Sequence, residues 1–146
     1  MAGDFEDLMK EIQERIFQDT RDTYGKQVFE RWLQPKHFGK MPNATVSARI
    51  TGSCGESMEI YLHIENDTVK GASFFTDGCG ASMACGSAAA ELAVDRTLDE
   101  IVLVGEDMIL EMLGGLPEDH RHCAMLAAET LQTAVHNYLI GSQIRK

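Results

Sequence analysis

Eight residues near the middle of the chain, SMEIYLHI at positions 57–64, alternate polar and apolar side chains. Because successive side chains of a β-strand point to opposite faces, this alternation predicts a strand with one buried face. Glu65-Asn66-Asp67 then predicts a turn, and TVKGASFFT at 68–76 returns as a second strand. ATVSARIT at 44–51 is a third candidate strand just upstream. Short connections imply antiparallel neighbours, so this part of the chain predicts an antiparallel sheet of three strands.

Helical periodicity lies on both sides of the predicted sheet. The candidate helices cover residues 4–22, a turn or helix around 24–32 that ends before Pro35, 81–94, 105–115 and 122–140. Thr97, with Glu100 three residues later, predicts a capping box at the start of one more helix. Since one helical region precedes the strands and the others follow them, the predicted class is α+β.

Length and charge narrow the possible partners. A chain of 146 residues suits one domain spanning positions 1–146. The formal net charge of −10 argues against a nucleic-acid partner, because phosphate binding needs a basic patch. No apolar run is long enough for a membrane-spanning helix, and the acidic N-terminus lacks a signal-peptide core, so we expect a cytoplasmic protein without a membrane partner. Without an export signal, metal or thiol chemistry is the better expectation for the four cysteines than disulfide bonds.

Three of the cysteines lie at the ends of predicted elements. Cys54 is in the glycine-rich turn TGSCGES, between the first two strands. Cys79 is in DGCG, where the third strand gives way to a helix, and Cys123 is in HRHC, at the opening of the last long helix. Thiols from three distant parts of the chain can therefore meet at one rim of a small domain.

The chemistry of those positions is consistent with a metal site. The unpaired N–H groups at a helix N-terminus stabilise a thiolate and lower its pKa, and neighbouring glycines let a bulky ligand approach. These arguments predict that Cys79 and Cys123 are exposed and reactive. Glu56 lies two residues after Cys54, and His122 directly precedes Cys123. Thiolates with imidazole or carboxylate form a ligand set for zinc, or for iron with sulfide, that can also release its metal.

Simpler interpretations apply to several of these residues. A cysteine in an alanine-rich helix is usually a small core residue, and we expect Cys85 to be one. Taken singly, Cys54 and Cys123 fit a core position as well as a metal site. Neither His63 nor His136 is assigned a role, and the methionines are expected to fill the core.

The motifs together resemble those of the iron–sulfur cluster assembly scaffolds, namely the IscU proteins and the N-terminal domain of NifU. The matching segments occur in the family's order and near its spacing, from about residue 30 to the C-terminus. They are WLQPKHFGKM (32–41), SCGESMEIYLHI (53–64), TDGCGASMACGSAAAEL (76–92), RTLDEI (96–101) and LPEDHRHCAMLAAETL (116–131). The resemblance implies a three-stranded antiparallel sheet packed by helices on one face, preceded here by a helical extension at 1–25.

The resemblance also implies a function. Such scaffolds are not enzymes in the usual sense; they accept sulfur from a cysteine desulfurase, bind iron, build a 2Fe–2S cluster and transfer it to apo-proteins. Carried over by position, the cluster ligands are Cys54, Cys79 and Cys123, with His122 beside the third. Cys123 is the expected persulfide acceptor, zinc is expected in the cluster-free state, and a cluster-loaded protein is expected to associate with a second copy.

The chain departs from the family pattern at several positions. Glu56 stands where aspartate is usual, so the same charge reaches one methylene further and joins the expected ligand set. Leu116-Pro117 is followed by Glu118-Asp119-His120 rather than Pro-Val-Lys, which argues against docking of an Hsp70-type chaperone. His120 replaces a lysine and becomes a candidate further ligand or proton carrier. Cys85 stands where alanine or serine is usual.

Two alternative functions stay open. One is a zinc-dependent sulfurtransferase of the SufU type, which holds its zinc and cycles one thiol through a persulfide. The lack of a large insertion between Cys79 and Cys123 argues against it. The other is a structural zinc-binding domain that only binds a partner, in which case chelation would unfold the chain.

Overall fold

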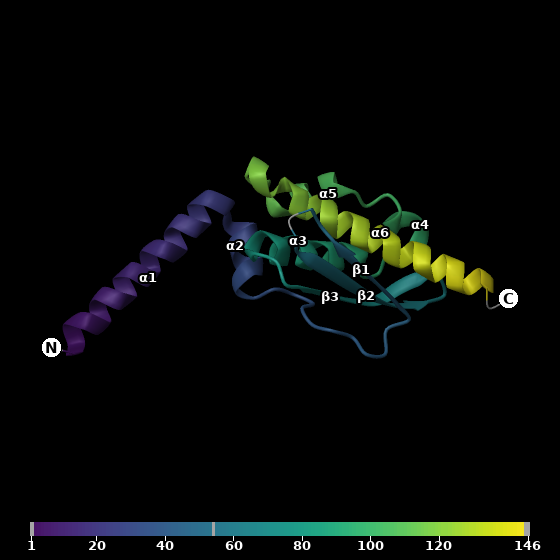
Figure 1. Ribbon diagram of the computed structural model, residues 1–146, viewed down its shortest axis with the longest axis horizontal. Coiled ribbons are helices and arrows are strands. Elements are labelled where there is room, and N and C mark those ends of the chain that lie inside the picture. The colour runs from purple at the N-terminus through teal and green to yellow at the C-terminus, as the bar shows by residue number, and fades with distance from the viewer. Residues whose placement is uncertain (1, 54, 145–146) are drawn as a thin grey trace.

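The protein is described by a computed structural model that covers residues 2–53 and 55–144 (Figure 1). Its elements follow one another in the order helices, strands, helices. They are α1 (Ala2–Tyr24), α2 (Lys26–Leu33), β1 (Val46–Thr51), β2 (Ser57–Glu65), β3 (Thr68–Thr76), α3 (Gly80–Ala93), α4 (Leu98–Ile101), α5 (Glu106–Leu113), the 3-10 turn η1 (Glu118–His120) and α6 (Arg121–Ile144). The α+β class predicted from the sequence is confirmed.

The three strands form one antiparallel sheet in the order β1-β2-β3. The register places Ile60 of β2 opposite Ala48 of β1 and Phe74 of β3. The predicted turn between β2 and β3 is present, and Asn66 and Asp67 both adopt positive φ, at 53° and 57°. Two left-handed residues in a row match the right-handed twist of a tight hairpin, and Asn and Asp tolerate this conformation well.

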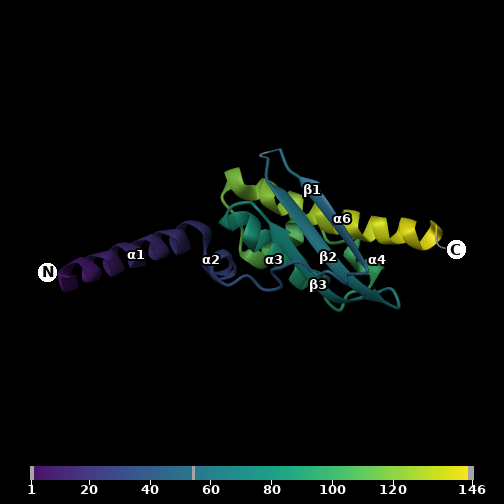
Figure 2. The ribbon, with the colours of Figure 1, turned by 60° about the horizontal axis from the view of Figure 1, so that its bottom comes forward.

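Helices α3 and α6 cover one face of the sheet, α3 over β3 and α6 over β1 (Figure 2). On β2, the predicted apolar face is buried: Met58, Ile60 and Leu62 are fully inaccessible to solvent. Helix α3 is buried along most of its length, and it is rich in alanine, glycine and serine. Small side chains let a helix backbone approach a sheet closely, so α3 is held tightly between the sheet and its neighbours. The predicted packing of helices on one face is confirmed.

Helix α1 extends away from the rest of the protein (Figure 1). It meets α2 where the ring of Phe17 packs edge-to-face on that of Phe29, with 5.8 Å between centroids. Its apolar side chains further out stay in solvent, and Phe5, Leu8 and Ile12 are 65%, 52% and 44% exposed. The periodicity therefore identifies the helix correctly, although the apolar stripe is not buried within this chain.

Two of the predicted helix ends are also present. The hydroxyl of Thr97 accepts a hydrogen bond from the backbone N–H of Glu100, and the Glu100 side chain bonds back, which completes the capping box of α4. Helix α5 ends at Gly114, whose φ of 76° is the left-handed conformation that glycine adopts at no steric cost. Among the described residues, no helix is both long enough and apolar enough to cross a membrane.

Candidate metal and sulfur site

The beginnings of α3, α6 and β2 lie close together at one side of the fold. Cys79 is the N-cap residue of α3, and Cys123 is the third residue of α6. The loop before β2 brings Glu56 to the same place, where its Oε1 lies 3.8 Å from the sulfur of Cys123 and 3.3 Å from Nε2 of His122. Nε2 of His122 is in turn 3.7 Å from that sulfur. Cys54, which the sequence predicts at this site, lies outside the described residues, so its position remains a prediction.

The side chains form two overlapping groups of potential metal ligands. Ligand atoms of Cys79, His120 and Cys123 all lie within 4.8 Å of one another, and so do those of Glu56, His122 and Cys123. Bonds of about 2.0–2.3 Å from one tetrahedral metal place its ligand atoms roughly 3.3–3.8 Å apart, so small side-chain movements suffice for binding. Cys123 belongs to both groups, and the predicted set is therefore brought together as far as the structure describes it.

Sequence reasoning missed Ser82, which is fully buried at the centre of this site. Its hydroxyl donates to Oε2 of Glu56 at 2.7 Å, and it lies 3.4 Å from the sulfur of Cys123 and 3.9 Å from that of Cys79. The spacing of three residues from Cys79 on a helix puts both side chains on one face. That spacing is the signal that could have identified Ser82 from the sequence.

The prediction that Cys123 is an exposed thiol of low pKa is wrong. Its side chain is inaccessible to solvent, and burial raises its pKa to about 12; the hydrogen bond from Ser82 opposes this rise, and the negative charge of Glu56 adds to it. Loss of water around the thiolate therefore outweighs the helix terminus. Cys79 is exposed, as predicted. Cys85 is a core residue, as predicted, and burial raises its pKa well above the ordinary range.

Steric crowding explains why glycines stand on both sides of Cys79. From the sequence they were expected to let a ligand approach, but side chains of the protein itself fill the space beside them. A Cβ on Gly80 would lie 2.6 Å from the ring of Trp32, which packs over this turn. A Cβ on Gly78 would lie 2.6 Å from the carboxylate of Glu56 and from the hydroxyl of Ser82. The two glycines therefore make room for the residues that build the site.

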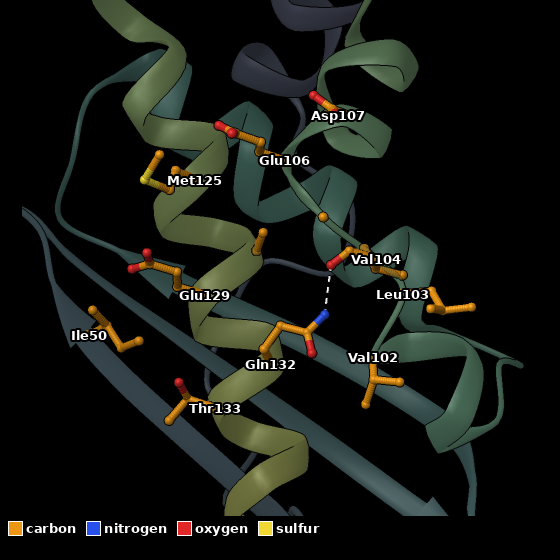
Figure 3. A pocket seen from close by; sticks show the side chains of 12 residues that line it. Ile50, Val102, Leu103, Val104, Glu106, Asp107, Met125, Glu129, Gln132 and Thr133 are labelled. Carbon is orange, nitrogen blue, oxygen red and sulfur yellow. Dashed lines mark hydrogen bonds between the residues drawn. The ribbon is translucent and has the colours of Figure 1, made fainter.

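A shallow cavity of about 250 Å³ borders the site, with Glu56, His122, Met125 and Glu129 in its wall. A larger cavity of about 600 Å³ shares Ile50, Met125 and Glu129 with it, and Figure 3 shows this second cavity between α6, β1 and the segment at 102–107. Acidic and apolar side chains line the larger cavity, and none of its lining residues is a cysteine or histidine. The ligand chemistry is thus concentrated at the Cys123 end.

The fold and the site together define a small α+β protein with thiol, imidazole and carboxylate groups gathered at the ends of its helices. The family described as NifU-like N terminal domain matches residues 23–144. The chain is 34% identical over 116 residues to iron-sulfur cluster assembly scaffold protein IscU 1 of Archaeoglobus fulgidus, covering 79% of this chain and 76% of that protein. It is 33% identical over 124 residues to nitrogen fixation protein NifU of Nostoc sp., covering 79% of this chain and 41% of that protein. The chain belongs to the NifU-like N-terminal domain family.

Solved structures show the same fold at lower sequence identity. A NifU-like N-terminal protein from Brucella abortus superposes with a TM-score of 0.64 at 18% identity, covering 82% of this chain and 96% of the other. A putative iron-sulfur cluster assembly scaffold protein for the SUF system, from Fervidobacterium islandicum, superposes with a TM-score of 0.62 at 22% identity. This match covers 79% of this chain and 98% of the other. At such identities the likeness concerns the fold alone.

Proposed function

We propose that this protein is a scaffold on which an iron–sulfur cluster is assembled and from which the cluster passes to apo-proteins. The observation that carries the proposal is the convergence of Cys79 and Cys123 with two histidines and a carboxylate at one end of the fold. The relatives support the same function: the IscU relative is named an iron-sulfur cluster assembly scaffold, and the NifU relative is named a nitrogen fixation protein.

The cluster in this proposal is a 2Fe–2S cargo, and zinc binds at the same end of the fold when the cluster is absent. Cys79, Cys123 and the predicted Cys54 supply thiolates, while His122 and Glu56 supply the weaker donors. Thiolates bind iron and zinc strongly, whereas a carboxylate is a harder and more exchangeable ligand. A mixed set therefore suits a protein that must release what it has built.

Cys123 is the proposed acceptor of sulfur from a cysteine desulfurase. In that step its thiolate attacks the outer sulfur of the donor's persulfide, a new S–S bond forms on Cys123, and the donor leaves as a thiolate. Because the pKa of Cys123 is raised to about 12, the free protein holds this residue as the thiol. A cation bound beside it favours loss of the proton, so we expect metal binding to precede sulfur transfer.

Anaerobic assembly tests the proposed function. The metal-free protein is mixed with ferrous iron, L-cysteine, a cysteine desulfurase and dithiothreitol, which reduces the transferred sulfur to sulfide; cluster absorption is followed, and iron and sulfide are counted per chain. Wild type should gain iron and sulfide in equal amounts, and Cys79→Ala and Cys123→Ala should gain neither. Cys85→Ala, the same change at a buried thiol outside both ligand groups, should behave as wild type. Normal assembly by the Cys79 and Cys123 variants would show that the site is misassigned.

A zinc-dependent sulfurtransferase is the second candidate, because two thiols and a histidine also suit zinc. The same experiment separates the two functions when zinc is counted as well. Zinc that stays bound while desulfurase turnover rises, with no cluster formed on adding iron, would favour the sulfurtransferase.

A further inference from the structure

We infer that His120 is a metal ligand, and that with Cys79 and Cys123 it forms a three-ligand site for a divalent ion such as Zn²⁺ or Fe²⁺. This site shares Cys123 with the Glu56–His122 group but is otherwise separate from it. The inference rests on the proposed function only in placing metal at this end of the fold, and it names the residues that receive the first ion.

The local backbone places His120 beside the thiols. His120 is the last residue of η1, and Cys123 follows three residues later in α6, so both side chains point to the same side of the turn. A ligand atom of the His120 ring lies within 4.8 Å of both the Cys79 and the Cys123 sulfur. The ring is stacked on that of His122, with centroids 6.5 Å apart and planes inclined by 27°. His120 is partly exposed, so an ion can reach it from solvent.

The donor atoms decide which group binds first. The His120 group offers two thiolates and an imidazole, and the Glu56 group offers one thiolate, an imidazole and a carboxylate. Zinc and ferrous iron prefer thiolate sulfur to carboxylate oxygen, so the first ion goes to Cys79, His120 and Cys123. A tetrahedral ion takes four ligands, so the three of this group would leave room for one further donor, either the expected Cys54 or an incoming sulfur.

Cobalt titration tests the inference without any cluster chemistry. The metal-free, reduced protein is titrated with Co²⁺ anaerobically, and the sulfur-to-cobalt charge-transfer band, the visible bands of tetrahedral cobalt and the affinity for Zn²⁺ by chelator competition are measured. His120→Gln should weaken binding of the first ion by about tenfold or more, because loss of a group that only orients a ligand already costs about 10–100-fold. His120→Cys should retain binding and gain charge-transfer intensity, because a third thiolate replaces the imidazole. His136→Gln, an exposed histidine of α6 outside both groups, should match wild type.

The comparison with His122 distinguishes this inference from the proposed function. His122→Gln should lower the affinity for the first ion less than His120→Gln does. If His120→Gln binds the first ion as wild type does, or if His122→Gln has the larger effect, the inference is overturned. Loss of Co²⁺ binding in Cys79→Ala and Cys123→Ala would in that case leave the scaffold function standing. Unchanged binding in those two cysteine variants would count against both. Circular dichroism of each variant confirms that the fold is retained.

Discussion

The described thiols differ in their access to solvent. Cys79 is exposed at the start of α3, whereas Cys123 and Cys85 are inaccessible. Because burial raises the pKa of Cys123 to about 12, this residue is held almost entirely as the thiol at pH 8. Of the two described thiols of the site, Cys79 is therefore the reactive nucleophile in the metal-free protein, and Cys123 is protected by burial.

Alkylation should follow this order. In the metal-free protein at pH 8, iodoacetamide should modify Cys79 about tenfold or more faster than Cys123, because Cys79 is exposed whereas Cys123 is buried. Peptide mass spectrometry over time measures both rates. The same reaction in guanidinium chloride is the control and should bring the rates together. Faster modification of Cys123 than of Cys79 would contradict the described burial.

Ser82 fixes the carboxylate of Glu56 and contacts the sulfur of Cys123. Ser82→Ala should therefore lower zinc affinity by about 10–100-fold, as is usual when a group that orients a ligand is lost. Chelator competition measures the affinity. Ser87→Ala is the matched control, since Ser87 is a buried serine of the same helix whose hydroxyl bonds to Lys36 and Glu91 instead. Equal affinities for the two variants would show that Ser82 has no role at the site.

At the residue scale, the sequence predicts which side chains meet but not how they meet. The positions of Glu56, Cys79, His122 and Cys123 at element ends were sufficient to predict that these side chains lie close together. The burial of Cys123 could not be predicted, because it depends on the packing of α6 against α3 and on the loop that brings Glu56 over the sulfur. Such packing is set by tertiary contacts and leaves no local pattern.

At the element scale, a bidentate ion pair joins α2 to α3. Nε of Arg31 lies 2.7 Å from Oε2 of Glu91, and Nη2 lies 3.0 Å from Oε1. Both side chains are largely buried, at 11% and 15% exposure. Burial by itself raises the pKa of Glu91, but the hydrogen bonds and the charge of Arg31 outweigh it, so the pKa lies below its ordinary value. The pair ties α2 to the C-terminal part of α3, while Trp32, the next residue of α2, packs over Gly80 at the other end of α3.

Breaking the pair should destabilise the fold in a pH-dependent way. Arg31→Met should lower the free energy of unfolding at pH 7 by about 1–3 kcal/mol, because the partly buried charge of Glu91 loses the two hydrogen bonds from the guanidinium group. A carboxylate whose pKa is lower in the folded than in the unfolded protein stabilises the fold. Its contribution is complete above the ordinary pKa of about 4.3 and is lost as the pH falls through the pKa of the folded state. Urea unfolding of the metal-free protein should show a difference between wild type and variant that shrinks below about pH 4. A difference that is constant or grows on acidification would contradict the assignment.

The sequence predicts the elements well where a local pattern exists. Strict alternation identifies β2, and the Thr97–Glu100 spacing identifies the start of α4. The sequence does not show that the apolar stripe of α1 remains exposed, because periodicity indicates an apolar face and not what covers that face. The role of Gly78 and Gly80 was also missed for a spatial reason, since the groups they accommodate come from α2 and from the loop before β2.

At the scale of the whole molecule, α1 stands apart from the sheet and from the site (Figure 1). The matched family begins at residue 23, near the end of this helix. Deletion of residues 1–22 should lower the free energy of unfolding by only about 1 kcal/mol, the scale of the lost Phe17–Phe29 ring contact. Urea unfolding and zinc affinity are the measurements, and the affinity should equal that of the full chain. Unfolding of the shortened chain, or loss of its metal, would show that α1 supports the core.

The central claim is that the convergent thiols hold an iron–sulfur cluster that the protein can transfer to an apo-protein. The most direct test is transfer: the anaerobically loaded protein is mixed with an apo-ferredoxin, and circular dichroism in the visible range follows the cluster. Loss of the scaffold signal with matching growth of the holo-ferredoxin signal, and without release of free iron to a chelator, is the predicted result. A cluster that stays on this protein while the ferredoxin remains empty would contradict the account.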